Sequence, residues 1–127
     1  MKKILLIEDN ESLVLVLSEF LQIQGFDVLV AADGSIGVKL AKEHNPDLIL
    51  CDITMPNMNG YEVLQYLGQE ESTAEIPFFF LGSQIEQYDS KKVPGMFKGY
   101  LLKPIDLYDL LAVINSQLNC WIVKANC

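Results

Sequence analysis

The chain alternates short apolar runs with longer stretches of mixed polarity. The apolar runs span residues 4–7, 28–32, 48–51, 78–81 and 100–102. Each has the length of a strand, and none alternates apolar with polar residues. Continuous runs of this kind are typical of strands in a parallel sheet that is covered on both faces. The pattern therefore predicts five buried strands.

The stretches between those runs carry apolar residues at helical spacing. Residues 12–24 are predicted to form a leucine-rich helix that ends at Gly25, because glycine commonly follows the last helical residue. Residues 35–43 are predicted to form a second helix, closed by Asn45–Pro46. Residues 61–69 are predicted to form a third helix.

Two further helices are expected near the end of the chain. Asp106 is expected to cap the last one, whose apolar face consists of Leu107, Leu110, Leu111, Ile114 and Leu118. The fourth helix is expected within residues 84–98, where Pro94–Gly95 shortens it and the apolar spacing is poor. Strand and helix thus alternate five times, which indicates an α/β fold with helices on both faces of a five-stranded parallel sheet.

Composition and charge exclude several classes of protein. The 127 residues suit one domain, and a hydrophobic share of 50% is enough for a core without disulfide or metal staples. The net charge of −8 and the lack of a lysine and arginine cluster argue against a nucleic-acid-binding surface. The apolar run that follows Lys3 breaks at Glu8, so it is too short for a secretory signal or a membrane span. Three cysteines without a C-x-x-C pair agree with a cytoplasmic location.

Polar residues follow four of the five predicted strands. Glu8 and Asp9 follow the first strand, Asp52 follows the third, and Lys103 follows the fifth. After the fourth strand come Gly82 and then Ser83. A single aspartate at a strand end is commonly a helix cap, but the carboxyl ends of parallel strands share one edge of the sheet. Crowded carboxylates repel unless a cation joins them, and oxygen ligands of this kind suit Mg²⁺. A metal, a lysine and a nucleophilic carboxylate together favour phosphoryl transfer.

Three motifs in this set resemble those of a known family. They are Glu8–Asp9, the D-x-x-M-P-x-M-x-G pattern of residues 52–60, and Lys103–Pro104. Together they resemble the receiver domain of two-component response regulators, similar to the bacterial chemotaxis response regulator. The resemblance implies a receiver domain over residues 1–119, with 120–127 as a C-terminal extension or linker stub. It also implies a flavodoxin-like (βα)5 fold with strand order 2-1-3-4-5.

The resemblance implies a role for each site residue. Asp52 would accept a phosphoryl group from a sensor histidine kinase or a phosphotransfer protein. Mg²⁺ would be held by Asp9, Asp52 and the backbone carbonyl of Thr54, with Glu8 acting through metal-bound water. Lys103 would contact the phosphoryl group. Such a domain is a regulatory switch and not an enzyme in the ordinary sense.

The resemblance also assigns structural positions. Pro56 and Gly60 would shape the loop that follows the acceptor, with Gly60 in a turn conformation that few residues tolerate. The bond between Lys103 and Pro104 is expected to be cis. The signal would pass to a downstream protein or to a removed output domain. A homodimer through the face of the fourth helix, fifth strand and fifth helix is a further expectation, without direct nucleic-acid or membrane binding.

The chain departs from the family at one position. The family's switch threonine or serine falls on Gly82, which carries no hydroxyl, and Ser83 is the nearby residue that could replace it. Tyr100 stands at the family's aromatic switch position. An alternative function is therefore a receiver-like protein-binding module with impaired or absent phosphate switching. A flavodoxin or an aspartate-dependent phosphatase fits less well, since the first strand lacks a glycine-rich phosphate loop and no second aspartate follows Ile53.

Overall fold

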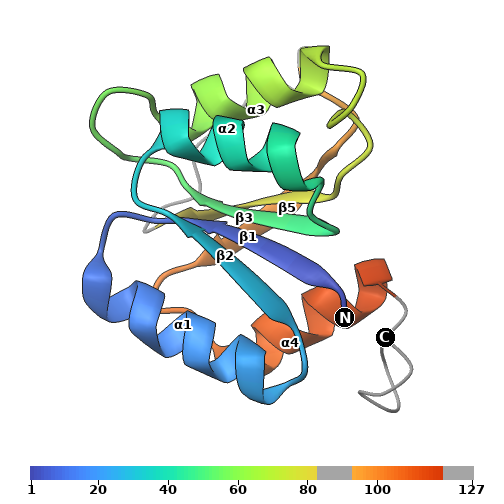
Figure 1. Cartoon of the computed structure of the whole chain (residues 1–127). Helices are drawn as coiled ribbons and strands as arrows, with labels where there is room; N and C mark the ends of the chain where they lie inside the picture. The colour runs from blue at the N-terminus through green and yellow to red at the C-terminus, as the bar shows by residue number, and fades with distance from the viewer. Residues whose placement is uncertain (83–92, 119–127) are drawn as a thin grey trace.

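Five parallel strands form one sheet in the described part of the chain, and helices cover both of its faces (Figure 1). The computed structural model describes residues 1–82 and 93–118. The strands are β1 (Lys3–Ile7), β2 (Asp27–Ala31), β3 (Leu48–Asp52), β4 (Phe78–Gly82) and β5 (Phe97–Leu102). The helices are α1 (Glu11–Ile23), α2 (Gly34–His44), α3 (Gly60–Gln69) and α4 (Leu107–Leu118). The strand order β2-β1-β3-β4-β5 confirms the predicted topology.

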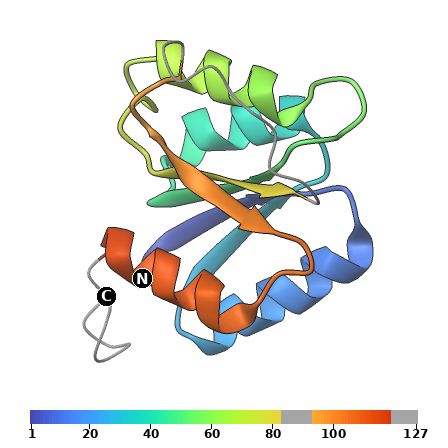
Figure 2. The same ribbon diagram turned by 180° about the vertical axis from the view of Figure 1, so that it is seen from behind.

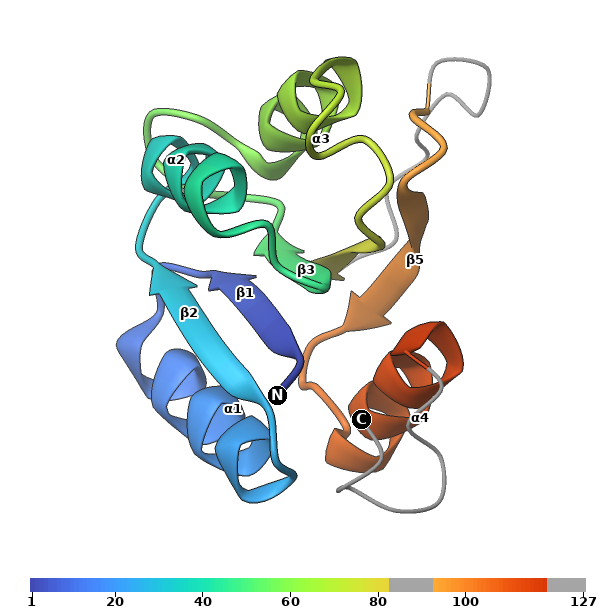
Figure 3. The same ribbon diagram turned by 45° about the vertical axis from the view of Figure 1, so that its right-hand side comes forward.

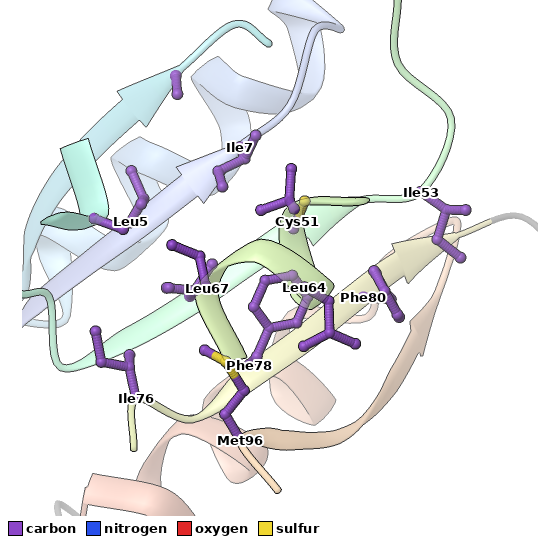
Figure 4. Close-up of a cluster of buried hydrophobic side chains, with 14 of the residues drawn as sticks. Leu5, Ile7, Cys51, Ile53, Leu64, Leu67, Ile76, Phe78, Phe80 and Met96 are labelled. Carbon is purple, nitrogen blue, oxygen red and sulfur yellow. The ribbon is translucent and has the colours of Figure 1, made fainter. Parts of the chain in front are cut away.

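The two faces of the sheet carry different pairs of helices. Helices α2 and α3 cover one face, and α1 and α4 cover the other (Figures 1 and 3). Successive residues of each strand point to opposite faces, so every strand contributes to two separate apolar clusters. The cluster under α2 and α3 includes Leu5, Ile7, Cys51, Leu64, Leu67, Phe78 and Phe80 (Figure 4). The cluster under α1 and α4 includes Ile4, Leu6, Leu17, Leu21, Leu50, Leu81, Leu110 and Ile114.

Short polar side chains cap the N-termini of α1, α2 and α3, at the edge of the sheet where the strands end. Asn10 accepts a hydrogen bond from the backbone N–H of Leu13 at 3.0 Å, and Asp33 accepts one from that of Ile36 at 2.9 Å. Asn59 and Glu62 form a capping box at the start of α3. Such caps satisfy backbone donors that have no partner within the helix, and they place each helix start beside the strand that precedes it.

The last helix agrees with its predicted cap and face. Asp106 accepts hydrogen bonds from the backbone N–H groups of Tyr108 and Asp109, at 2.8 and 3.1 Å. The predicted apolar residues of α4 all belong to the cluster beneath α1 and α4. No helix in the described ranges has the length and apolarity that a membrane span requires.

Strand β5 begins earlier than the predicted strand at residues 100–102. A β-bulge explains the difference, because Phe78 pairs with Phe97 while Phe79 pairs with Gly99. Lys98 is the extra residue, and Gly99 has a φ of +151° that few other residues adopt. The polar Lys98 and the glycine interrupt the apolar pattern, so the run alone did not reveal the start of the strand. Figure 2 shows β5 at one edge of the sheet.

The predicted fourth helix falls largely outside the described residues. Of its expected range, 84–98, the structure describes only residues 93–98. These contain a turn at Gly95–Met96 and the first residues of β5, so the helix does not extend through them. Pro94 lacks the N–H group that a continuing helix would need at this point.

Candidate functional site

Three charged side chains meet at the carboxyl ends of the central strands. Glu8 directly follows β1, Asp52 is the last residue of β3, and Lys103 directly follows β5. The ammonium nitrogen Nζ of Lys103 lies 2.8 Å from Oε1 of Glu8 and 3.3 Å from Oδ1 of Asp52. The lysine therefore bridges two carboxylates, as the shared edge of a parallel sheet allows.

Backbone hydrogen bonds hold these residues to neighbouring strands. The N–H of Glu8 donates to the carbonyl of Ala31 at 3.0 Å, and the N–H of Lys103 donates to the carbonyl of Gly82 at 2.7 Å. Asp52 is in register with Leu81 on β4. Each charged group is thus fixed by the sheet and not by a free loop, which keeps the site preorganised.

Burial controls the charge of Glu8. The residue is 1% exposed, and this removal from water raises the pKa of its carboxyl group above the ordinary value, with the charge of Asp52 adding to the rise. Hydrogen bonds from Lys103 and from the N–H of Asn10, the latter at 3.1 Å, act in the opposite direction without cancelling it.

The pKa of Lys103 is also set by burial on one side and by neighbouring charges on the other. Partial burial lowers its pKa, but the hydrogen bond and attraction to Glu8, together with the charge of Asp52, outweigh burial and raise the pKa. The ammonium group therefore stays charged at any ordinary pH. Its side chain is 26% exposed, which leaves a path from solvent to the site.

Glu8→Gln is expected to change the pH dependence of stability in metal-free buffer. A carboxyl group with a raised native pKa holds its proton more tightly in the folded chain than in the unfolded chain. Its contribution to the free energy of unfolding is therefore present at low pH and is lost as pH rises above 4.5 and through the native pKa. The glutamine variant lacks this loss, so it should gain stability relative to wild type as pH rises. Urea denaturation at several pH values with a chelator measures the difference.

The matched control for this experiment is Glu19→Gln, which neutralises an exposed carboxylate on α1. If the free energy of unfolding of the Glu8 variant falls relative to that of wild type as pH rises, the assignment of a raised pKa to Glu8 is wrong.

Glu8, Asp9 and Asp52 form an acidic cluster that could hold a cation. Each offers a carboxylate oxygen, and these oxygens all lie within 4.8 Å of one another. Glu8 and Asp52 are buried, whereas Asp9 is exposed and faces solvent. Lys103 supplies one positive charge for three carboxylates, so the donor set retains an excess of negative charge. Hard oxygen donors with an open side fit Mg²⁺, which usually keeps several of its waters.

The loop over residues 53–59 leads from β3 to α3. Its tightest point is a γ-turn at Asn57, which has a φ of 70°, and the N–H of Met58 donates to the carbonyl of Pro56 at 2.9 Å. The carbonyl of Pro56 closes this turn, and Asn57 has the positive φ, which the sequence analysis did not assign to it.

The expected role of Gly60 was wrong in one respect. Gly60 is the first residue of α3 and is not among the residues with positive φ. The position needs a residue without a side chain, because a Cβ atom there would lie 2.4 Å from the carbonyl oxygen of Asp52 and 2.9 Å from Cε1 of Phe80. The Gly60 N–H also donates to the carbonyl of Ile53 at 2.8 Å. The glycine allows α3 to start in direct contact with the end of β3.

The remaining predicted positions lie on or beside β4 and β5. Gly82 ends β4, and Tyr100 is a half-buried residue whose ring contacts those of Phe80 and Phe97. The Lys103–Pro104 bond is cis, as the resemblance implied. Ser83 lies outside the described residues.

Cys51 is not a candidate nucleophile. Its thiol is fully buried next to Asp52, and burial raises its pKa well above the ordinary value, with the charges of Asp52 and Glu8 adding to the effect. Only the thiolate is reactive. Cys51 is therefore a packing residue of β3.

Comparison with known proteins identifies a family. A family model described as the response regulator receiver domain matches residues 4–115. Protein PilH of Pseudomonas aeruginosa is 36% identical over 121 residues, which cover 93% of this chain and 98% of that protein. The probable transcriptional regulator ycf29 of Pyropia yezoensis is 39% identical over 96% of this chain. The chain spans about half the length of several curated relatives that it matches, including 55% of ycf29.

Solved structures agree with this match. The chemotaxis protein CheY4 of Vibrio cholerae has a TM-score of 0.83 and 26% identity, covering 91% of this chain and 98% of that one. The receiver domain of sensor histidine kinase PA1611 from Pseudomonas aeruginosa also has a TM-score of 0.83 and 26% identity, covering 93% and 98%. That protein was crystallised with a magnesium ion coordinated in its active-site cleft.

Proposed function

Because this chain belongs to the response regulator receiver domain family, we propose that it is a phosphorylation switch whose acceptor is Asp52. Receiver domains are regulatory parts of two-component systems and are not generally classed as enzymes. The single observation that carries the assignment is the contact of Lys103 with Asp52 at 3.3 Å, within a site that also contains Glu8 and Asp9.

The chain's own residues prepare Asp52 to act as a nucleophile. The N–H of Ile53 donates to Oδ1 of Asp52 at 2.8 Å, and Lys103 contacts the same oxygen, so the carboxylate has a fixed orientation. One carboxylate oxygen would form the new P–O bond while the P–N bond of a phosphohistidine on a sensor kinase or phosphotransfer protein breaks. Lys103 would then bind a phosphoryl oxygen, because an ammonium group stabilises the charge spread over those oxygens.

The acidic cluster fits a magnesium ion as the cofactor. Asp9 and Asp52 would hold it with the backbone carbonyl of Thr54, and Glu8 would act through bound water. When bound, the ion neutralises negative charge on the carboxylates and on the phosphoryl oxygens. The exposed position of Asp9 supports entry of the ion from solvent.

The proposed function is tested by phosphorylation without a kinase. The purified protein is incubated with Mg²⁺ and a small-molecule phosphodonor such as acetyl phosphate, and its intact mass is followed. We expect the mass of one phosphoryl group to appear and to disappear on treatment with hydroxylamine, which cleaves acyl phosphates. A mass that stays unchanged with Mg²⁺ and donor in excess would overturn the proposal.

Asp9→Asn is expected to weaken Mg²⁺ binding by about tenfold, which corresponds to about 1.4 kcal/mol. The reason is the loss of a charged oxygen ligand from a site with few protein ligands. Titration of Mg²⁺ with backbone amide shifts as the readout measures the affinity. Glu11→Gln is the control, because Glu11 is an exposed carboxylate two residues away and outside the cluster. Equal affinities for wild type and the Asp9 variant would remove Asp9 from the ligand set.

A second candidate function is a receiver-like binding module with impaired switching. The observation that favours it is Gly82, which provides no hydroxyl to contact a phosphoryl group at the end of β4. Comparing wild type with Gly82→Thr, each with and without beryllofluoride as a phosphate mimic, separates the two functions. A wild type that binds the mimic without any shift at Tyr100, while the threonine variant responds, would favour the binding module.

The partners follow from the same proposal. The signal would leave through a downstream protein or an output domain outside the 127 residues given. A homodimer through the face of β5 and α4 is a further proposal, supported by the exposure of Leu102 at 48% and Tyr108 at 87%. We place the domain in the cytoplasm, because Cys51 is a free thiol and the cysteine spacing indicates no disulfide framework.

A further inference from the structure

The ring of Phe80 lies where four other aromatic rings meet. Its centroid is 5.0 Å from that of Tyr61, 5.2 Å from Phe78, 5.4 Å from Phe97 and 5.7 Å from Tyr100. Phe80 is fully buried within the cluster beneath α2 and α3 (Figure 4). These separations are within the range of favourable aromatic contacts. The ring is therefore the centre of an aromatic group that joins α3, β4 and β5.

One edge of this ring lies close to Gly60, where residues 53–59, which we call the acceptor loop, meet the start of α3. A Cβ atom at Gly60 would lie 2.9 Å from Cε1 of Phe80 and 2.4 Å from the carbonyl oxygen of Asp52. Gly60 is also tied by its N–H to the carbonyl of Ile53. Because the space between Gly60, the Asp52 carbonyl and the ring has no room for a methyl group, a displacement of the Asp52–Ile53 backbone toward Gly60 would push Gly60 against the ring.

The other side of the ring reaches Tyr100. Phe80 and Tyr100 are register partners in the parallel β4–β5 ladder, so their Cα atoms lie side by side and their rings contact each other. The bulge at Lys98 places Phe97 and Tyr100 on the same face of β5, although their positions differ by three, an odd number that would put them on opposite faces of a regular strand. A movement of the Phe80 ring therefore meets Tyr100 directly.

Position 82 offers no comparable connection. Gly82 has no side chain, and in the described structure it pairs with Leu102 and accepts a hydrogen bond from the N–H of Lys103 at 2.7 Å. These are backbone contacts that hold the sheet together. Among the described residues, one route of packing contacts from the acceptor loop to Tyr100 runs through the Gly60 backbone and the Phe80 ring.

We propose that Phe80 is the positioning residue that couples the acceptor loop to Tyr100, through its contacts with Gly60 and with the Tyr100 ring and independently of a side chain at position 82. The inference rests on the proposed function only in taking phosphorylation of Asp52 as the event that moves the loop.

The experiment compares Phe80→Leu with Phe78→Leu. Both phenylalanines are fully buried on the same face of β4, so both variants lose a similar amount of packing, and denaturation curves check that both are folded. Phe78 has its ring contact with Phe80 at 5.2 Å and is two residues farther from the acceptor edge. Beryllofluoride with Mg²⁺ is added to each protein. The amide of Ile53 reports occupation of the acceptor, and the amide and ring signals of Tyr100 report transmission.

At equal occupation, we expect the Tyr100 response of Phe80→Leu to fall by roughly twofold or more relative to wild type and Phe78→Leu. An undiminished response in Phe80→Leu, or an equal loss in both variants, would overturn the inference. If Ile53 does not respond in wild type, the proposed function fails, and Asp52→Asn then serves as the perturbation. The shift that Asp52→Asn causes at Tyr100 should be smaller in the Phe80→Leu background than in the Phe78→Leu background. Equal shifts in both backgrounds would overturn the coupling independently of phosphorylation.

Discussion

Asp52→Asn is expected to abolish the mass gain that wild type shows with Mg²⁺ and a phosphodonor. An amide cannot form the acyl phosphate, and Asp52 is the aspartate that contacts Lys103 at the end of β3. The amide has nearly the same shape as the carboxylate, so the hydrogen bond from the Ile53 N–H to Oδ1 can persist. Intact-mass spectrometry over the same time course measures the loss, and circular dichroism checks that the variant is folded.

The control is Asp109→Asn, which removes an exposed carboxylate on α4 and should leave phosphate uptake unchanged. A wild-type rate in the Asp52 variant would show that another residue is the acceptor. Peptide mapping would then locate it, with the neighbouring Asp9 and Glu8 as the first positions to check.

Gly60→Ala is expected to lower the free energy of unfolding by about 1–3 kcal/mol, the range for overpacking a well-packed interior. The added Cβ would meet the backbone oxygen of Asp52 at 2.4 Å and the Cα of Ile53 at 3.0 Å. Backbone atoms of a central strand cannot move aside as the end of a flexible side chain can, so α3 or the acceptor loop must shift. Urea denaturation measures the loss.

Gly95→Ala provides the matched control for that substitution. A Cβ atom at Gly95 would have nothing within 4 Å, and Gly95 does not have a positive φ. The alanine should therefore raise stability by about 0.4–1 kcal/mol, by restricting the unfolded chain. A Gly60 variant as stable as wild type would mean that the approach of α3 to β3 is looser than the structure describes.

The sequence was sufficient to predict the architecture and the convergence of the site. Continuous apolar runs identified the strands, and the topology of a parallel sheet brings their carboxyl ends to one edge. The contact between Lys103 and Asp52, which are 51 residues apart, follows from that rule. The cap at Asp106 was predicted too, because short polar side chains favour helix starts, whereas the caps at Asn10, Asp33 and Asn59 were not predicted.

Other features depend on packing that no local pattern encodes. The 2.8 Å contact between Glu8 and Lys103 requires the reach of both side chains and the burial of Glu8. The true requirement at Gly60 arises from atoms of Asp52 and Phe80, which lie on two other strands. The run 78–80 was predicted as core strand, yet which ring would lie at the centre depends on residues contributed by α3 and β5.

The bulge in β5 has a consequence for association between chains. β5 is an edge strand of the sheet, and an edge presents backbone groups that another chain could pair with, which is a common origin of aggregation. The extra residue Lys98 interrupts the regular spacing of those groups and places an exposed charge on the edge. An incoming strand that paired with β5 would have to bury that charge or leave the backbone groups at the bulge without partners. Within the described sheet, the irregularity that aligns Tyr100 with Phe80 therefore also makes the β5 edge a poor template for fibre-like growth.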